Sequence, residues 1–202
     1  MILPCALPDG PARDPAAVGT DANRRPGNTP VPAMEIELRD AVPTDAACLI
    51  ELRRTIFGES DFMLYAPDEY ADSTDAMAKR IEEISQSSGS RLIVALADKV
   101  PAGFLSVTGS EIPRRRHVGY VVIGVVRAHW SRGMGEALLT EALRWAPTAG
   151  ITRLELGVMT ENARAIRLYE RLGFRVEGTR KGAYLIGGKP VDEHFMACLI
   201  ET

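Results

Sequence analysis

The sequence predicts an α/β fold in which helices pack on a single mixed sheet, with strands and helices in the order βααβββαβαββ. Three observations support this prediction. Short runs alternate apolar and polar residues, or are wholly apolar, as strands do, whereas other segments repeat apolar residues at helical spacing. The two kinds of segment are interleaved along the chain, which favours helices layered on a sheet. No internal repeat and no break in composition interrupts residues 34–202.

The first half of the domain is predicted to place two helices between strands. Each helix has a suitable residue at its start, Thr44 or Asp45 for the first and Ser73 or Thr74 for the second. A tight turn over residues 98–101 separates two strands. The predicted elements are strand 35–41, a helix with Ala46, Leu49, Ile50 and Leu52 on its apolar face, an irregular segment 58–72, helix 73–85, and strands 90–98 and 101–110.

The second half is predicted to alternate strands and helices and then to end in two strands. The run "HVGYVVIGVV" is apolar enough to predict a strand buried on both faces. The last helix is expected to stop at Gly173, which suits the left-handed residue after a helix. The predicted elements are strand 117–126, a helix after Gly135 with Leu138, Leu139, Ala142, Leu143 and Ala146 on its apolar face, strand 153–159, helix 163–172, and strands 174–180 and 192–200 flanking a loop with Gly182, Gly187 and Gly188.

Residues 1–33 differ in composition from the rest of the chain. Seven of the thirteen prolines lie there, among Gly, Asp, Asn and Thr, and large apolar residues are few. Such a segment buries too little apolar surface to offset the entropy lost on ordering. We therefore expect a Pro-rich mobile tail over residues 1–33 and a single domain over residues 34–202, with Met34 as a candidate start of translation.

Composition and charge argue against several functional classes. A net charge of −3 over 202 residues gives no general reason to expect a nucleic-acid partner. No apolar run approaches the length that spans a membrane. The cysteines are far apart and form no CxxC pair, which indicates reduced thiols and a cytoplasmic protein. The histidines share no ligand spacing with them, so we expect no metal site. These residues are Cys5, Cys48, Cys198, His117, His129 and His194.

Two glycines precede the helix with the clearest apolar spacing. Gly133 and Gly135 let backbone amides approach a ligand closely, and the unpaired N–H groups and positive dipole end of a helix N-terminus suit a phosphate or pyrophosphate. The alternative is a plain glycine-rich turn into a helix. Common nucleotide motifs do not fit, because a dinucleotide fingerprint needs Gly or Ala where Leu138 stands and no Walker GK[ST] is present.

Two stretches of the second half carry a more specific pattern. They are "VVRAHWSRGMGEALL" and "LELGVMTENARAIRLYERLGF", the latter followed by "EGTR". Together they resemble the GCN5-related N-acetyltransferases (GNAT), whose acetyl-CoA motif runs from the fourth strand through an Arg/Gln-x-x-Gly-x-Gly/Ala loop into the next helix. The resemblance covers about residues 35–200. The second stretch carries it through Leu156, Val158, Asn162, Ala165, Leu168, Tyr169, Gly173 and Phe174.

The resemblance implies the GNAT acyl-CoA N-acyltransferase fold, with acetyl-CoA as cosubstrate. It implies that N–H groups of the glycine loop hold the pyrophosphate, and that the pantetheine arm lies between splayed strands, bonded to backbone like an added strand. Trp130 departs from the pattern at the Arg/Gln position, and Arg132 can supply the missing charge. Glu136 is expected to point to solvent. The implied cofactor-binding residues are Val125, Val126, Arg132, Gly133, Met134, Gly135, Glu136, Asn162 and Tyr169.

Asn162 and Tyr169 each have a structural and a functional interpretation. Asn162 suits the N-cap of the next helix, and in the family this residue also contacts the cofactor arm. Tyr169 suits a core aromatic position, but the motif favours it as the catalytic residue that protonates, or hydrogen-bonds to, the leaving thiolate. A backbone N–H near Val125 would hold the oxyanion formed when a neutral amine attacks the thioester.

The sequence does not identify the general base. The run 117–126 contains no carboxylate, and His117 at its start would lie roughly 26 Å from Val125, which is too far for direct proton transfer. The groups left open are His194, Asp192, Tyr120, Glu111 and a chain of water molecules.

The predicted activity is transfer of an acetyl group from acetyl-CoA to a primary amine of a small molecule, such as an amino acid, a polyamine or a drug-like amine. In the family, the region of residues 58–72 and the loop from Gly182 to Gly188 cover the acceptor site. Two alternatives stay open: acetylation of a protein N-terminus or lysine, and a non-catalytic acyl-CoA-binding sensor. A homodimer also stays open.

Overall fold

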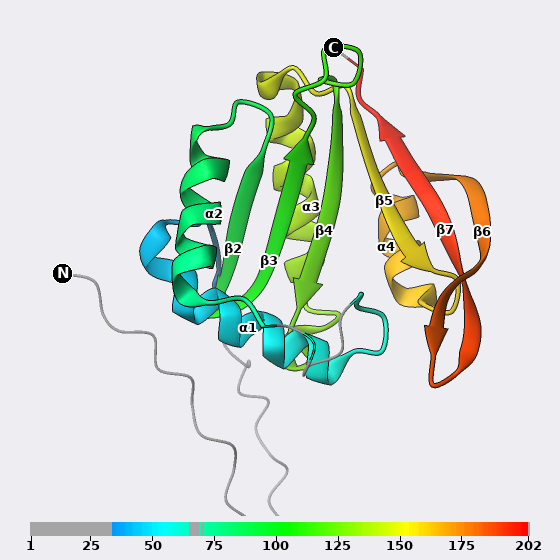
Figure 1. Cartoon of the computed structure of the whole chain (residues 1–202), viewed down its shortest axis with the longest axis horizontal. Helices are drawn as coiled ribbons and strands as arrows, with labels where there is room; N and C mark the ends of the chain where they lie inside the picture. Colours follow the sequence, from blue (N-terminus) through cyan, green and yellow to red (C-terminus); the bar gives the residue numbers. More distant parts are fainter. Residues whose placement is uncertain (1–33, 65–68, 70, 202) are drawn as a thin grey trace, which may run out of the picture.

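The computed structural model describes residues 34–64, 69 and 71–201 (Figure 1). The predicted tail over 1–33, and part of the irregular segment 58–72, therefore lie outside the described residues. The order of elements is the predicted one. The strands are β1 (Ile36–Asp40), β2 (Arg91–Ala97), β3 (Val100–Gly109), β4 (Val118–Val125), β5 (Arg153–Met159), β6 (Arg175–Ile186) and β7 (Lys189–Leu199), and the helices are α1 (Ala46–Glu59), α2 (Thr74–Gln86), α3 (Met134–Trp145) and α4 (Ala163–Arg171).

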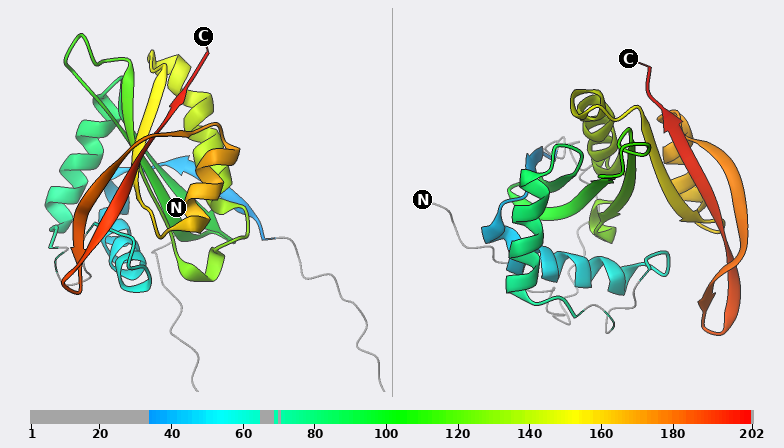
Figure 2. Two further views of the ribbon diagram at one scale, coloured as in Figure 1. Left: turned by 90° about the vertical axis from the view of Figure 1, so that its right-hand side faces the viewer. Right: turned by 45° about the horizontal axis from the view of Figure 1, so that its top comes forward.

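One seven-stranded sheet in the order β1-β2-β3-β4-β5-β7-β6 forms the centre of the fold. Helices α1 and α2 cover one face, and α3 and α4 cover the other (Figures 1 and 2). Successive side chains of a strand point to opposite faces, so Phe104 packs with α1 and α2 while its neighbour Leu105 packs with α3. The predicted mixed sheet with helices packed on it is confirmed.

The helix starts agree with the predicted caps in one case and differ in the other. Ser73 caps α2 by accepting a hydrogen bond from the backbone N–H of Ala76 at 3.2 Å. Asp45 occupies the N-cap position of α1, but its carboxylate does not cap the helix. It pairs with Arg39 at 2.7 Å and accepts from the N–H of Val42 at 2.8 Å, because the β1 side chain brings a charge within reach.

Strand β4 is not buried on both faces as predicted. Val121 is buried against α3, but on the other face Tyr120 is 38% exposed and Val122 is 40% exposed. The apolar run suggested complete burial because valine is common in buried strands. In the fold, this second face of β4 borders an opening in the sheet, so part of it stays accessible.

The last hairpin is longer than predicted. Strand β6 continues to Ile186, and Gly182 lies within it at a bulge with φ of 59° instead of in a loop. The connection to β7 is the pair Gly187 and Gly188, both with positive φ, as a two-residue hairpin turn requires. The predicted loop is therefore mostly strand.

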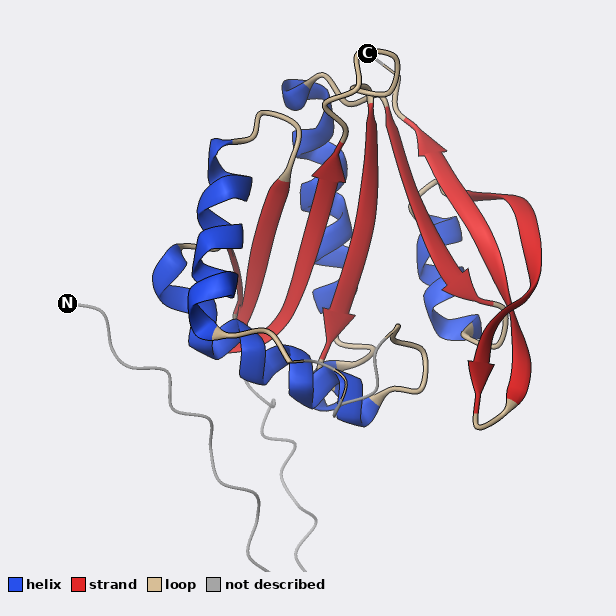
Figure 3. Cartoon of the chain, in the orientation of Figure 1, coloured by secondary structure: helices blue, strands red, loops and turns tan. Residues whose placement is uncertain are grey.

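The sheet opens between its central strand β4 and the neighbouring strand β5. β4 and β5 run parallel but pair over only three residues, from Val118 with Arg153 to Tyr120 with Glu155. Beyond Tyr120 the two strands diverge, which Figure 3 shows as a widening gap. The backbone of β4 from Val121 to Val125 therefore has no strand partner on its β5 side, and this opening positions the candidate site.

Among residues 34–64, 69 and 71–201, no helix is long and apolar enough to cross a membrane. Over the same ranges, no three His, Cys, Asp or Glu side chains lie close enough together to hold a metal ion.

Candidate active site

A cavity of about 1240 Å³ occupies the opening between β4 and β5. Side chains from both faces of the sheet line it, so the cavity passes through the sheet. On the α1/α2 side it is lined by Arg53, Phe57, Phe104, Ser106, Tyr120, Val122, Tyr184 and Glu193, and on the α3/α4 side by Gly133, Gly135, Asn162, Arg164, Leu168 and Tyr169.

The glycine loop at the start of α3 forms one end of the cavity. Gly133 is the N-cap in the left-handed region with φ of 87°, and a Cβ there would meet no atom within 4 Å. The first bond of the helix runs from the N–H of Ala137 to the carbonyl of Gly133. The preceding N–H groups, of Met134, Gly135 and Glu136, thus have no partner within the helix. This arrangement suits an anion.

The apolar side chain of this loop is buried, and its charged side chains are exposed. Met134 is fully buried in the core, so only its backbone can serve a ligand. Glu136 is exposed, as predicted, and its carboxylate lies 3.7 Å from Arg171. Arg132 is also exposed and does not line the cavity. The role of Arg132 as the positive charge of the motif therefore stays a prediction, since its side chain does not line the cavity.

The edge of β4 offers the backbone N–H of Val125 but no backbone group of Val126. The N–H of Val126 donates to the carbonyl of Ala102 in β3 at 2.9 Å, and its carbonyl accepts from the N–H of His129. Because successive residues of an antiparallel pair face opposite ways, Val125 faces away from β3 and towards the opening. The pairing predicted for Val126 is not supported, since its backbone groups already bond within the chain and it does not line the cavity.

Trp130, the departure from the motif, joins the two sides of the opening. Its indole N–H donates to the carbonyl of Val125 at 2.6 Å. The guanidinium of Arg164, at the start of α4, lies 3.3 Å from the centre of the Trp130 ring, and that of Arg127 lies 5.2 Å from it. Burial and the charge of Arg127 lower the pKa of Arg164. Arg164 lines the cavity, so its positive charge lies there beside the ring of Trp130.

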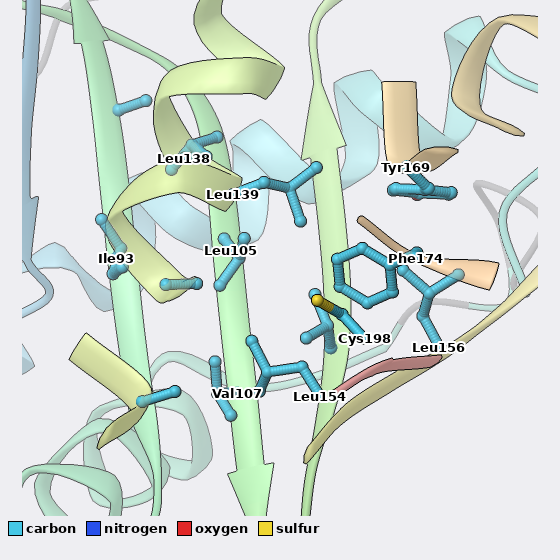
Figure 4. Packing of buried hydrophobic residues seen from close by; sticks show 14 of the residues in the cluster. Ile93, Leu105, Val107, Leu138, Leu139, Leu154, Leu156, Tyr169, Phe174 and Cys198 are labelled. Atoms are coloured by element: carbon cyan, nitrogen blue, oxygen red, sulfur yellow. The ribbon is translucent and has the colours of Figure 1, made fainter. Parts of the chain in front are cut away.

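Helix α4 contributes the two residues that the motif singled out. The Asn162 side chain caps the helix by accepting from the N–H of Ala165 at 3.2 Å, and it also lines the cavity. Tyr169 is 7% exposed and lines the cavity two turns further on. Its ring packs against Phe174 at 5.9 Å between ring centres (Figure 4). Burial, and then the nearby Tyr120, raise the pKa of Tyr169.

Besides Arg164, Glu193 of β7 was missed from the sequence; it lines the cavity and is only 2% exposed. Tyr184 donates its hydroxyl to Glu193 Oε1 at 2.6 Å. Arg180 lies 2.9 Å from Oε2 but is not aligned to donate a hydrogen bond to it. Alternation along β7 places Glu193 on the same face as the buried residues Val191 and Ala197, and that pattern was the available signal.

Of the side chains left open as the general base, only Tyr120 lines the cavity. Tyr120 lines the cavity, and burial raises its pKa. Asp192 pairs with Lys181 at 2.8 Å, and His194 contacts Thr179 at 2.9 Å. Neither of these two, nor the exposed Glu111, lines the cavity.

Comparisons with known proteins agree with this geometry. Residues 56–174 match the family model described as "Acetyltransferase (GNAT) family". The L-amino acid N-acetyltransferase AaaT of Escherichia coli K12 is 34% identical over 117 residues, which are 57% of this chain and 72% of that protein. The N-alpha-acetyltransferase RimI of Mycobacterium tuberculosis is 41% identical over 66 residues, which are 33% of this chain and 40% of that protein.

Solved structures of acetyltransferases have the same fold, as two of them show. The GNAT-family acetyltransferase of Streptococcus pneumoniae has a TM-score of 0.80 and 31% identity, over 83% of this chain and 100% of that one. YncA of Salmonella typhimurium, solved with its cofactor acetyl-CoA, has a TM-score of 0.74 and 23% identity, over 83% of this chain and 95% of that one. At that identity, the second likeness concerns the fold alone.

Proposed function

The chain belongs to the GNAT family of N-acetyltransferases, and from this premise we propose that it transfers the acetyl group of acetyl-CoA to the primary amine of a small molecule. Amino acids are the favoured acceptor class. A cytoplasmic location belongs to the same proposal and draws its support from the scattered cysteines.

The cavity that passes through the sheet is the observation that carries this proposal. Its α3/α4 side presents a helix N-terminus, the left-handed Gly133 and the backbone N–H of Val125, whose carbonyl already accepts from the Trp130 indole. These groups suit a pyrophosphate followed by an amide-bearing arm. The α1/α2 side presents a carboxylate, hydroxyls and aromatic rings, which suit a compact polar acceptor. We assign the cofactor to the first side and the acceptor to the second.

Acetyl-CoA, when bound, supplies an activated acetyl thioester. Tyr169 lies in the cavity on the cofactor side, and its raised pKa keeps the hydroxyl protonated at neutral pH. In this position the hydroxyl can hydrogen-bond to, or protonate, a leaving sulfur. The N–H of Val125 faces the same opening and can stabilise negative charge on the carbonyl oxygen. A tyrosine in this position favours an enzyme over a non-catalytic sensor.

Two observations favour an amino acid among acceptors. The E. coli relative AaaT is named as an L-amino acid N-acetyltransferase. In this chain, Arg53 of α1 lines the acceptor side, with its guanidinium 4.8 Å from the centre of the Phe104 ring. A cation there and the Glu193 carboxylate offer opposite charges to an acceptor that carries both a carboxylate and an amine.

The proposal is tested by calorimetry and by thiol release. We expect acetyl-CoA to bind the pure chain, and expect L-amino acids to release CoA faster than spermidine or a peptide with a free N-terminus and a lysine. Faster acetylation of the peptide would favour a protein acceptor instead. Binding without thiol release from any acceptor would favour a sensor, and absence of binding would overturn the assignment of the cofactor side.

Replacing Arg164 with alanine should weaken acetyl-CoA binding by roughly 10- to 150-fold, because a charge-assisted contact to phosphate is worth about 1.5–3 kcal/mol. Arg132→Ala removes the same charge from an exposed position outside the cavity and should change the Kd less than about twofold. Calorimetry on the two variants measures both effects. A larger loss for Arg132→Ala would return the phosphate contact to Arg132.

A further inference from the structure

We propose that Glu193, held by Tyr184, is the site that binds the acceptor's amine and takes its proton. This inference rests on the proposed function and assigns a residue for the acceptor that the motif of the family does not contain. Glu193 comes from β7, whereas the glycine loop and Tyr169 come from α3 and α4. The site therefore joins two parts of the chain that are distant from each other in the sequence.

The first argument is the placement of a buried carboxylate in the wall of the cavity. Glu193 is 2% exposed, and it lines the cavity on the α1/α2 side. A buried charge is unfavourable unless it is paired and hydrogen-bonded. Tyr184 donates to Oε1 at 2.6 Å, and Arg180 forms an ion pair with Oε2 at 2.9 Å that is not aligned as a hydrogen bond. An ammonium group is a suitable donor for that oxygen.

The second argument is the position of the carboxylate at the gap between β4 and β5. A Cβ built on Gly157 of β5 would overlap Glu193 Oε1, and would lie 3.2 Å from the Tyr120 hydroxyl. The carboxylate thus lies directly over the Gly157 backbone, beyond the last paired residues of the two strands. Tyr169 reaches the same cavity from the opposite face. An amine bound at Glu193 would therefore face a thioester that lies next to Tyr169.

The third argument is the contrast with Glu155, the other buried carboxylate of this face. Glu155 is bonded through Oε1 to Arg115 at 2.9 Å and through Oε2 to Arg153 at 3.1 Å, and it does not line the cavity. Both of its oxygens have aligned donors, as expected of a structural ion pair. Glu193 differs in having one oxygen without an aligned donor and in lying at the cavity.

Tyr184 orients the carboxylate and does not compete with it for the proton. Burial, followed by the hydrogen bond to Glu193 and the charge of that residue, raises the pKa of Tyr184 to about 12. The hydroxyl therefore stays protonated and donates to Oε1. Among the described residues, Tyr120 from β4, Arg180 from β6 and Arg53 from α1 also lie on this side of the cavity or against the carboxylate. A positioning role for Tyr184 follows.

The acetyl transfer needs only the acceptor, acetyl-CoA, Glu193 and Tyr169. The acceptor arrives as an ammonium ion, and Glu193 takes one proton to give the neutral amine. The nitrogen lone pair forms the N–C bond, the C–S bond breaks with its electron pair on sulfur, and Tyr169 protonates the sulfur. The second proton lost by nitrogen restores the Tyr169 hydroxyl. Glu193 then releases its proton to solvent, so one proton is produced per turnover.

The test compares Glu193→Gln with the matched control Glu155→Gln. The probe is whichever L-amino acid the wild-type chain acetylates fastest. Glu193→Gln should raise the KM for this amine and lower kcat, with kcat/KM reduced at least about 100-fold. In calorimetry with CoA present, its amine Kd should rise about tenfold, while the Kd for acetyl-CoA alone stays unchanged. Glu155→Gln should keep wild-type values in all three measurements.

Each outcome decides one question. If the wild-type chain acetylates no amino acid, the proposed acceptor class fails. If it does, and Glu193→Gln keeps the amine KM, kcat and Kd of the control, the inference about Glu193 alone is overturned. Should Glu193→Gln not fold, Tyr184→Phe replaces it, because loss of the orienting hydroxyl should still raise the amine KM several-fold. An unchanged amine KM in Tyr184→Phe would then overturn the inference.

Discussion

Replacing Tyr169 with phenylalanine is expected to lower kcat by about 100- to 10,000-fold, the range that a positioned general acid contributes. The ring would remain packed against Phe174, so the fold and the wall of the cavity should persist. The Kd for acetyl-CoA should change less than about twofold, because the change removes only one hydroxyl. Stopped-flow or steady-state thiol release gives kcat, and calorimetry gives the Kd.

A second variant separates chemistry from packing at this position. Tyr169→Leu removes the hydroxyl and also the ring contact with Phe174, so it should lose both turnover and stability. Tyr169→Phe should lose turnover alone, with an unchanged melting temperature. If Tyr169→Phe kept more than about a tenth of the wild-type kcat, another group would have to protonate the leaving sulfur.

Replacing Phe174 with alanine is expected to have the largest effect on stability, lowering the free energy of unfolding by about 3–5 kcal/mol. Phe174 is fully buried in the core cluster between the sheet and helices α3 and α4. Tyr169, Leu139, Leu156 and Cys198 surround it in Figure 4. Removing the ring would leave a cavity that rigid strands and helices cannot fill. Urea unfolding, monitored by circular dichroism, measures the change.

The control for Phe174→Ala is Leu185→Ala on β6, where the side chain is 75% exposed. That variant should change stability by less than about 0.5 kcal/mol, because little apolar surface leaves the core. A comparable loss in both variants would contradict the packing described for Phe174. A loss confined to Phe174→Ala, with a lower kcat as well, would indicate that this ring also holds Tyr169 in place.

Most of the fold could be predicted because its elements are local patterns. Helical spacing located α3 and α4, and alternation located β1 and β5, since these periods reflect which side chains face the core. The failures have a common physical origin. The exposure of the second face of β4 depends on the opening in the sheet, and the length of the β6–β7 hairpin depends on pairing between strands. A local run of residues determines neither.

The candidate site was predictable only where a motif names its residues. Gly133 and Gly135 were found from their place before an apolar helix, and Asn162 and Tyr169 from the resemblance to the GNAT family, and all four line one cavity. Glu193 and Arg164 belong to no such pattern. Glu193 matters because its carboxylate lies opposite Gly157, and Arg164 matters because its guanidinium lies over the Trp130 ring. Contacts of this kind appear only when segments that are distant in sequence are placed together.

The separation of β4 from β5 has a consequence for the order of events in catalysis. If the cofactor and the acceptor occupy opposite sides of this gap, as proposed above, neither needs to depart before the other arrives. No covalent acetyl-enzyme is then required. Initial velocities should be measured while the concentrations of acetyl-CoA and of the acceptor amine are both varied. The double-reciprocal lines should intersect, in contrast to the parallel lines of a ping-pong enzyme.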